Sequence, residues 1–154
     1  MEVTIRPVRA ADLPEVITLI AALAVHHQDS ATLALSALER DVLGPNPWVT
    51  LLVAQTEGRV QGYVALCPLA QVQYGMRGMD IHHLYVAAHL RGTGIGGRLI
   101  AHATAAATAM GCAYVTVGTY PENAAAQRLY LAAGFDPLEG KAVRFRKKIA
   151  QAGS

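Results

Sequence analysis

The most informative stretch of the chain is residues 84–97, which read LYVAAHLRGTGIGG. Glycine makes up 14 of the 154 residues, so six positions should hold about half a glycine, yet four of the last six are glycine. An apolar run precedes the cluster and a helical pattern follows it, so unpaired helical amides and the positive end of a helix dipole converge there. Glycines let an anion approach the backbone, and Arg91 adds a charged donor. The stretch predicts a strand, a loop that binds a diphosphate, and a helix; a turn that only packs the helix closely on a sheet is the alternative.

Two common nucleotide motifs fit these glycines less well. The spacing Gly92-x-Gly94-x-x-Gly97 satisfies the dinucleotide fingerprint. That fingerprint follows the first strand of a parallel unit and needs an acid about 20 residues later, whereas residues 111–115 contain none. A nucleoside-triphosphate loop needs Lys followed by Ser or Thr, and residues 97–99 offer neither. NAD and ATP are therefore disfavoured, and a nicotinamide-binding oxidoreductase stays as an alternative.

The rest of the chain has the pattern of one α/β domain. Alternating apolar runs predict strands, and apolar residues at a period of 3.6 predict helices. Strands are expected at 3–9, 49–55, 60–67, 79–86 and 113–119, with two more around Phe135 and at 143–149. Four helices are expected. The first is capped by Asp12 and ends near His27, and the second runs from a cap at Ser30 to Gly44. The third runs from the glycine cluster to about Met110, and the fourth from Pro121 to Gly134. We expect a single domain at 1–150 and a loose tail at 151–154.

Two motifs resemble those of the GNAT acetyltransferase superfamily. The first is Arg91-x-x-Gly94-x-Gly96 after a strand that ends at Val86, which is similar to the acetyl-CoA motif of that family. The second motif comprises Asn123, Ala126, Leu129, Tyr130, Gly134 and Phe135. The element order resembles the family over nearly the whole chain. The resemblance implies the GNAT acyl-CoA N-acyltransferase fold, an α/β fold with a mixed sheet, mostly antiparallel at its N-terminal side, whose fourth and fifth strands splay apart.

The resemblance also implies where acetyl-CoA binds. The backbone of residues 84–86 would pair with the pantetheine arm, with the amide of Val86 facing the thioester carbonyl, and the amides of 91–97 would hold the pyrophosphate. The cleft is expected between residues 80–86 and 115–120. The implied cofactor-binding residues are Leu84, Tyr85, Val86, Arg91, Gly92, Thr93, Gly94, Ile95, Gly96, Gly97, Asn123 and Ala126.

Acetyl transfer to an amine requires a neutral nucleophile, a donor for the developing oxyanion, and a proton for the departing thiolate. Tyr130 occupies the position of the family's general acid, and a tyrosine pKa of about 10 suits this role. The alternative is an ordinary tyrosine at the edge of the core.

The candidate bases lie on the strand before the glycine loop. His82 is the first choice, since its position resembles the one where polyamine acetyltransferases carry a glutamate and serotonin acetyltransferases a histidine; His83 is the second. An alkylamine has a pKa about four units above that of histidine, so direct deprotonation would cost roughly 5 kcal/mol, and a water relay or a desolvated amine stays open. Alternation places one set of side chains on one face, Asp80, His82, Leu84 and Val86, and another on the opposite face, Ile81, His83 and Tyr85. Asp80 would then stabilise a His82 cation, although both histidines could simply be half buried and hydrogen bonded.

Composition argues against nucleic-acid and membrane partners. The formal net charge is only +2, and Arg144, Arg146, Lys147 and Lys148 fit the solvent face of a last strand. No apolar run reaches the 18 residues of a membrane span. Residues 16–25 imitate a signal peptide, but acids precede them and the apolar spacing is helical.

Cysteine and histidine spacing predicts no metal site and no acyl-enzyme. Cys67 and Cys112 fit small core residues of a cytoplasmic protein, and neither has an evident base partner. The pairs at 26–27 and 82–83 lack the spacing of a helical zinc site. The resemblance to the GNAT superfamily implies an N-acetyltransferase that moves the acetyl group of acetyl-CoA to a primary amine of a small molecule, amino acid or peptide in a ternary complex, and the cysteine usage predicts a cytoplasmic location. A non-catalytic CoA-binding or interaction module is the alternative, and a homodimer is common in the family.

Overall fold

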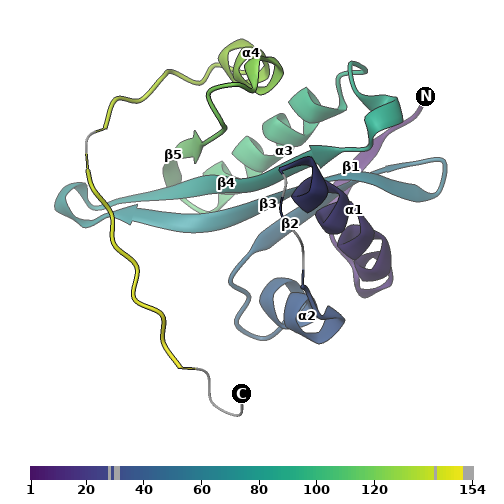
Figure 1. The fold of residues 1–154 in the computed structure, drawn as a ribbon, viewed down its shortest axis with the longest axis horizontal. Helices are drawn as coiled ribbons and strands as arrows, with labels where there is room; N and C mark the ends of the chain where they lie inside the picture. Colours follow the sequence, from purple (N-terminus) through teal and green to yellow (C-terminus); the bar gives the residue numbers. More distant parts are fainter. Residues whose placement is uncertain (28, 30–31, 141, 151–154) are drawn as a thin grey trace.

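The computed structural model describes residues 1–27, 29, 32–140 and 142–150, so the expected cap at Ser30 and the expected tail at 151–154 lie outside the described residues. Strands and helices follow one another along the chain in the predicted order as far as residue 132 (Figure 1). The longer elements are β1 (Thr4–Pro7), α1 (Leu13–His26), α2 (Leu35–Leu43), β2 (Thr50–Thr56), β3 (Arg59–Gln71), β4 (Met76–Val86), α3 (Ile95–Ala109), β5 (Cys112–Val117) and α4 (Ala124–Ala132).

The strands form one mixed sheet in the order β1-β2-β3-β4-β5. Neighbouring strands are antiparallel from β1 to β4, and β5 runs parallel to β4. The turn between β2 and β3 has two residues with positive φ, Glu57 at 53° and Gly58 at 73°, which suits the twist of a tight hairpin. The structure thus confirms the expected α/β fold with a mostly antiparallel N-terminal sheet.

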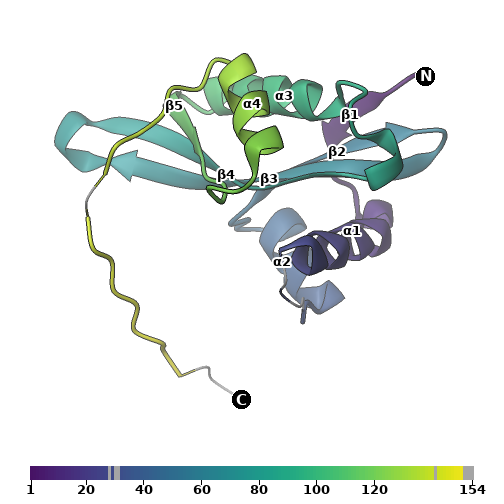
Figure 2. The same cartoon turned by 45° about the horizontal axis from the view of Figure 1, so that its top comes forward.

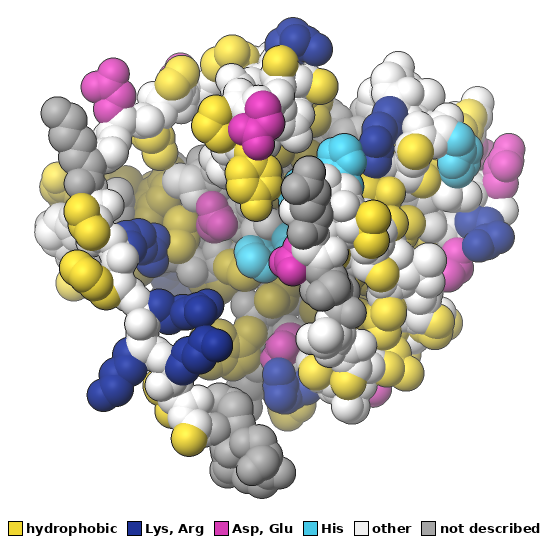
Figure 3. Space-filling view, viewed as in Figure 1, with side chains coloured by type: hydrophobic (Ala, Val, Ile, Leu, Met, Phe, Trp, Pro, Cys, Tyr) yellow, Lys and Arg dark blue, Asp and Glu magenta, His cyan; other side chains and the backbone are white. Residues whose placement is uncertain are grey.

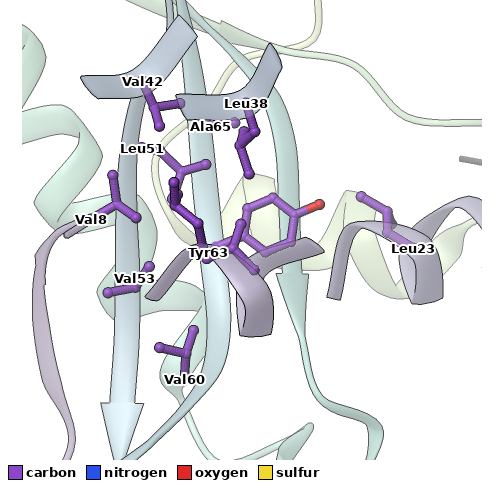
Figure 4. Close-up of a cluster of buried hydrophobic side chains, with 11 residues drawn as sticks. Val8, Leu23, Leu38, Val42, Leu51, Val53, Val60, Tyr63 and Ala65 are labelled. Atoms are coloured by element: carbon purple, nitrogen blue, oxygen red, sulfur yellow. The ribbon is translucent and has the colours of Figure 1, made fainter. Parts of the chain in front are cut away.

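Helices cover both faces of the sheet. Figure 2 shows α1 and α2 on one face, and α3 with α4 on the other. Between α1, α2 and the sheet lies one cluster of buried side chains, built around the fully buried Tyr63 and including Leu13, Val16, Leu38 and Leu51 (Figure 4). A second cluster lies between α3 and the opposite face of the same strands and includes Met79, Ile81, Ile95 and Leu99. The central strands β2 and β3 therefore contribute alternate residues to two separate cores.

A buried ion pair joins β1 to the start of α1. The carboxylate of Asp12 accepts hydrogen bonds from Arg6 Nη1 at 2.7 Å, Arg6 Nη2 at 2.9 Å and the Arg9 amide at 2.7 Å. The sequence predicts that the Asp12 side chain caps α1. Asp12 does precede the helix, but its side chain makes no capping hydrogen bond. These bonds lower the pKa of Asp12, so their stabilisation is present above the unfolded pKa of about 3.9 and is lost as the pH falls through the lower folded value.

The strands expected after α4 are absent from residues 133–140 and 142–150. Figure 1 shows this segment passing the end of the β3–β4 hairpin and leading away from the sheet. Phe145 is 94% exposed and Val143 is 80% exposed, and the basic residues around them belong to an extended segment rather than to a strand. The prediction was wrong because an alternating pattern shows that a segment can form a strand but supplies no partner for its backbone.

The hairpin between β3 and β4 is longer than the sequence predicted. Pairing continues to Gln71 and Met76, so residues expected in a polar loop are strand, and only 72–75 connect the two strands. Gly75 has a positive φ of 62°, which lets the chain turn between the two strands.

No helix in the described part of the chain is long and apolar enough to cross a membrane.

Candidate active site

A β-bulge in β4 decides which way the candidate bases point. Ala65 pairs with His83 and Leu66 pairs with Ile81, so His82 is an extra residue without a partner of its own on β3. The bulge reverses the alternation beyond Ile81, and the predicted grouping of faces was wrong for this reason. Leu84 packs on the same side as Ile81, in the core beneath α3.

Both histidines consequently lie on the face that α1 and α2 cover. Their rings stack with centroids 4.4 Å apart, and both line one pocket on that face. We call this space the histidine pocket; its volume is about 360 Å³, and α1, α2 and strands β2 to β4 contribute to its walls. Figure 3 shows histidine side chains beside a hollow near the middle of this side of the molecule.

Tyr63 holds His83 from within the core. The Tyr63 hydroxyl lies 3.1 Å from His83 Nδ1, and the Tyr63 side chain is fully buried. Burial raises the pKa of Tyr63, so its hydroxyl keeps its proton. Burial, helped by the neighbouring His82 and His27, lowers the pKa of His83 to about 4, so this ring is neutral above about pH 5.

Sequence reasoning missed Tyr63 and the end of α1 as parts of this site. His27 follows α1, and its ring meets the ring of Tyr120 edge to face at 5.3 Å, which brings the end of α1 close to the chain beyond β5. The available signal was that Tyr63 begins the apolar run of residues 63–67 in β3, which is typical of any core tyrosine.

Asp80 is bonded to β5 rather than to a histidine. Among the described residues its hydrogen bond comes from Thr116 Oγ1, at 2.7 Å. Asp80 and Thr116 are also register partners, so the bond joins β4 to β5 side by side. This contact gives Asp80 a structural role that the sequence did not predict.

The two parallel strands separate directly after this contact. Their last register pair is Ile81 with Val117, whereas β4 continues to Val86. Residues 82–86 therefore have no β5 partner on that side. The opening begins at His82, slightly later than the start of the expected cleft at residues 80–86 and 115–120.

The glycine loop lies where β4 ends. Gly92 has φ of 78°, and Gly94, the residue before α3, has φ of 88°, a conformation that favours glycine. Apart from the glycine itself and its two chain neighbours, no heavy atom lies within 4 Å of the place where a Cβ on either residue would be. The space in front of both glycines is therefore open. Arg91 Nε donates to the Val86 carbonyl at 3.2 Å, and its guanidinium lies 5.3 Å from the centre of the Tyr85 ring.

Glycine is needed at position 96 for a different reason than at positions 92 and 94. A Cβ on Gly96 would come 3.3 Å from a methyl carbon of Leu129, so the missing side chain lets α4 pack closely on α3. The cluster therefore combines a turn that needs positive φ with a close helix contact.

The helix α4 brings the second motif to the same end of the sheet. Asn123 caps α4, because its Oδ1 accepts a hydrogen bond from the Ala126 amide at 3.1 Å. Tyr130 is half buried against the core beneath α3 and meets Phe135 edge to face at 6.0 Å. Burial raises the pKa of Tyr130, which keeps its hydroxyl protonated near neutral pH.

Cys67 and Cys112 are free thiols of intermediate exposure, and burial raises the pKa of Cys67, which disfavours a thiolate. Within the described ranges, no three His, Cys, Asp or Glu side chains are grouped so as to hold a metal ion.

Comparison with known proteins agrees with this architecture. Residues 17–135 match the model of the acetyltransferase (GNAT) family. No curated protein sequence matches the chain. An aminoglycoside acetyltransferase from an uncultured soil metagenomic sample, in complex with sisomicin, is 22% identical, with a TM-score of 0.77 over 96% of this chain and 97% of that one.

Two further solved structures have the same fold. A ribosomal-protein-alanine N-acetyltransferase from Brucella melitensis biovar Abortus 2308 is 22% identical, with a TM-score of 0.76 over 94% of this chain and all of that one. AAC(6')-Iy in complex with a CoA-S-monomethyl-acetylneamine bisubstrate analogue is 20% identical, with a TM-score of 0.80 over 97% of this chain and all of that one. The family match spans the pocket, the strand opening, the glycine loop and α4, and the chain accordingly belongs to the GNAT acetyltransferase family.

Proposed function

We propose that this protein is an N-acetyltransferase that moves the acetyl group of acetyl-CoA to a primary amine of a small molecule, amino acid or peptide, by direct attack in a ternary complex. One observation carries the proposal. After leaving β5 at Ile81, β4 presents both histidines of the histidine pocket and then runs through residues 84–86 into the glycine loop. One strand segment that lacks a partner on its β5 side thus links a pocket for an acceptor to a loop suited to a diphosphate.

The residues of the loop fit the cosubstrate. The first amides of the 15-residue helix α3 lack partners within the helix, and the open space before Gly92 and Gly94 lets a diphosphate reach them. Arg91 supplies a charge beside Val86. The unpaired side of residues 84–86 would accept the pantetheine arm as an added strand. Acetyl-CoA itself supplies the activated thioester.

The proposal also gives roles to three residues of the α4 region, which are Asn123, Ala126 and Tyr130. Asn123 and Ala126 bond to each other at the start of α4, so they would shape the cofactor side of the opening through the position of that helix. Tyr130 is proposed to donate the proton that the departing sulfur takes up, and its raised pKa keeps it in the donor form.

His82 is the proposed base, with His83 as its support. The buried Tyr63 hydroxyl is hydrogen bonded to Nδ1 of His83, so this ring nitrogen is already engaged, and the low pKa of His83 disfavours its cation. His83 held in this way is a poor proton acceptor, whereas His82 is exposed beside it. His82 would take the proton directly or through water, after the apolar pocket has favoured the neutral amine.

Substitution of the two histidines should lower activity to different extents. We expect His82→Gln to lower kcat/KM about 100-fold, since a missing general base costs roughly this much. His83→Gln should change kcat/KM less, because a ring with a pKa of about 4 does not take up a proton near neutral pH. Initial rates of CoA thiol release between pH 5.5 and 9 measure both; a larger loss in His83→Gln than in His82→Gln would reverse the assignment.

Thermal unfolding with acetyl-CoA, CoA, NAD and ATP in parallel tests the proposed function. A ligand at 100 times its Kd stabilises a protein by about 2.7 kcal/mol, which is a readable shift at this size. We expect only the CoA compounds to raise the Tm, and thiol release to depend on an added amine. A shift with NAD alone would support an oxidoreductase, and CoA binding without turnover on any amine would support a non-catalytic module.

A further inference from the structure

We propose that the histidine pocket takes an acceptor with one amine on an apolar body, such as an alkylamine or arylalkylamine, and discriminates against polycations. This inference rests on the proposed acetyl transfer and goes beyond it by naming the substrate class. It is carried by the composition of the pocket wall and by the pairing of its one carboxylate.

The wall of the histidine pocket is mostly aliphatic. Its apolar members come from α1, the segment before α2, α2 itself and the sheet, and they include Ile20, Leu33, Leu38, Val42 and Leu51. Several of them also belong to the core cluster around Tyr63, so the wall is a continuation of packed core rather than a mobile surface. An apolar group that enters this space of about 360 Å³ leaves water and meets hydrocarbon.

Among the described residues of the wall, Asp41 is the one carboxylate, and it already has a cation. Arg40 Nε donates to Asp41 Oδ1 at 2.9 Å, and Arg40 Nη2 donates to Oδ2 at 3.1 Å. Both carboxylate oxygens therefore face a guanidinium. An acceptor with several ammonium groups would lose water around each of them and would find no unpaired carboxylate in this wall.

The same wall helps the chemistry of a single amine. Burial in apolar surroundings disfavours the ammonium form and lowers the pKa of the amine. The neutral amine then lies beside His82 and His83, which also line the pocket and carry no negative charge that would restore the ammonium. An apolar body thus serves both binding and deprotonation.

Trp48 gives a binding signal that does not depend on turnover. It is the one tryptophan of the chain. Its amide and that of Val49 donate to the Asp41 carbonyl at 2.9 and 3.0 Å, which fixes the indole-bearing residue next to two residues of the wall. Its side chain is exposed, and we expect its fluorescence to change when the neighbouring pocket is occupied.

In the test, four compounds are titrated separately into a solution of the protein and CoA. They are 2-phenylethylamine, spermidine, neamine and the uncharged 2-phenylethanol. Trp48 fluorescence and calorimetry report binding, and thiol release with acetyl-CoA reports kcat/KM. We expect 2-phenylethylamine to bind and to exceed spermidine and neamine at least about 10-fold in kcat/KM, with 2-phenylethanol binding but not reacting. Equal or higher kcat/KM for either polycation overturns the inference, as does failure of 2-phenylethylamine to bind.

A charge placed in the wall should reverse the preference. Leu33→Asp adds an unpaired carboxylate to the pocket, and we expect the ratio of kcat/KM for spermidine to that for 2-phenylethylamine to rise about 10-fold. Leu35→Asp is the matched control: it makes the same change two positions away, at a residue that is 48% exposed and outside the wall, and should leave the ratio unchanged. An unchanged ratio in folded Leu33→Asp overturns the inference; if that variant fails to fold, the panel on the native chain decides.

The two proposals can fail separately. Binding of 2-phenylethylamine without thiol release from any amine would support the pocket assignment and contradict acetyl transfer. Thiol release with spermidine or neamine in preference would support acetyl transfer and contradict the pocket assignment.

Discussion

Replacement of Gly94 by valine is expected to abolish binding of acetyl-CoA, with an increase in Kd of at least about 100-fold. Gly94 precedes α3 at a φ of 88°, where a branched side chain is strained, and the space in front of it is open. Valine would place its methyl groups in this space and would shift the loop, so a diphosphate could no longer reach the first amides of the helix. Calorimetric titration with acetyl-CoA measures the loss.

Gly111→Val separates this effect from general strain. Gly111 lies between α3 and β5, has φ of 80°, and likewise has open space around the position of a Cβ. Both variants should therefore unfold at a lower temperature for the same backbone reason. Only Gly94→Val should lose the cosubstrate; equal acetyl-CoA affinity in the two variants would contradict the assignment of the glycine loop to phosphate binding.

Tyr130→Phe is expected to lower kcat about 100-fold or more, since loss of a general acid typically costs between about 10² and 10⁴. The affinity for acetyl-CoA should stay within about two-fold, because the ring and its contact with Phe135 are kept. The change removes only a half-buried hydroxyl that burial holds in its protonated form. Steady-state thiol release and calorimetry on the same preparation separate the two effects.

Tyr74→Phe is the matched control for the Tyr130 variant. Tyr74 lies in the connection between β3 and β4 and is 68% exposed, so loss of its hydroxyl should leave both kcat and affinity unchanged. A kcat for Tyr130→Phe within about three-fold of the native value would show that water or another group protonates the sulfur.

Prediction from the sequence succeeded where the signal is local. Gly92 and Gly94 have the positive φ values that a glycine-rich turn before a helix suggests, and α3 follows this turn as predicted. Strand and helix order follow from the period of apolar residues, because each period reflects the geometry of its own segment.

Prediction failed where one strand depends on another. One extra residue at His82 reversed the side-chain alternation of β4, and no property of the strand itself marks this bulge. The pattern at 143–149 is that of a strand, yet these residues form no strand in the structure. A period of two describes one strand, whereas register and pairing belong to two strands.

The sequence by itself determined the order of the elements as far as residue 132 and the glycine loop before α3, because turn conformation and apolar period are properties of neighbouring residues. The resemblance of its two motifs to the GNAT superfamily is confirmed by the family match. Only the tertiary structure decided that His82 and His83 share a pocket, that Tyr63 holds His83 and that Asp80 bonds Thr116. Bulges, strand separation and the burial that lowers the pKa of His83 arise from packing between distant segments, and no local pattern encodes them.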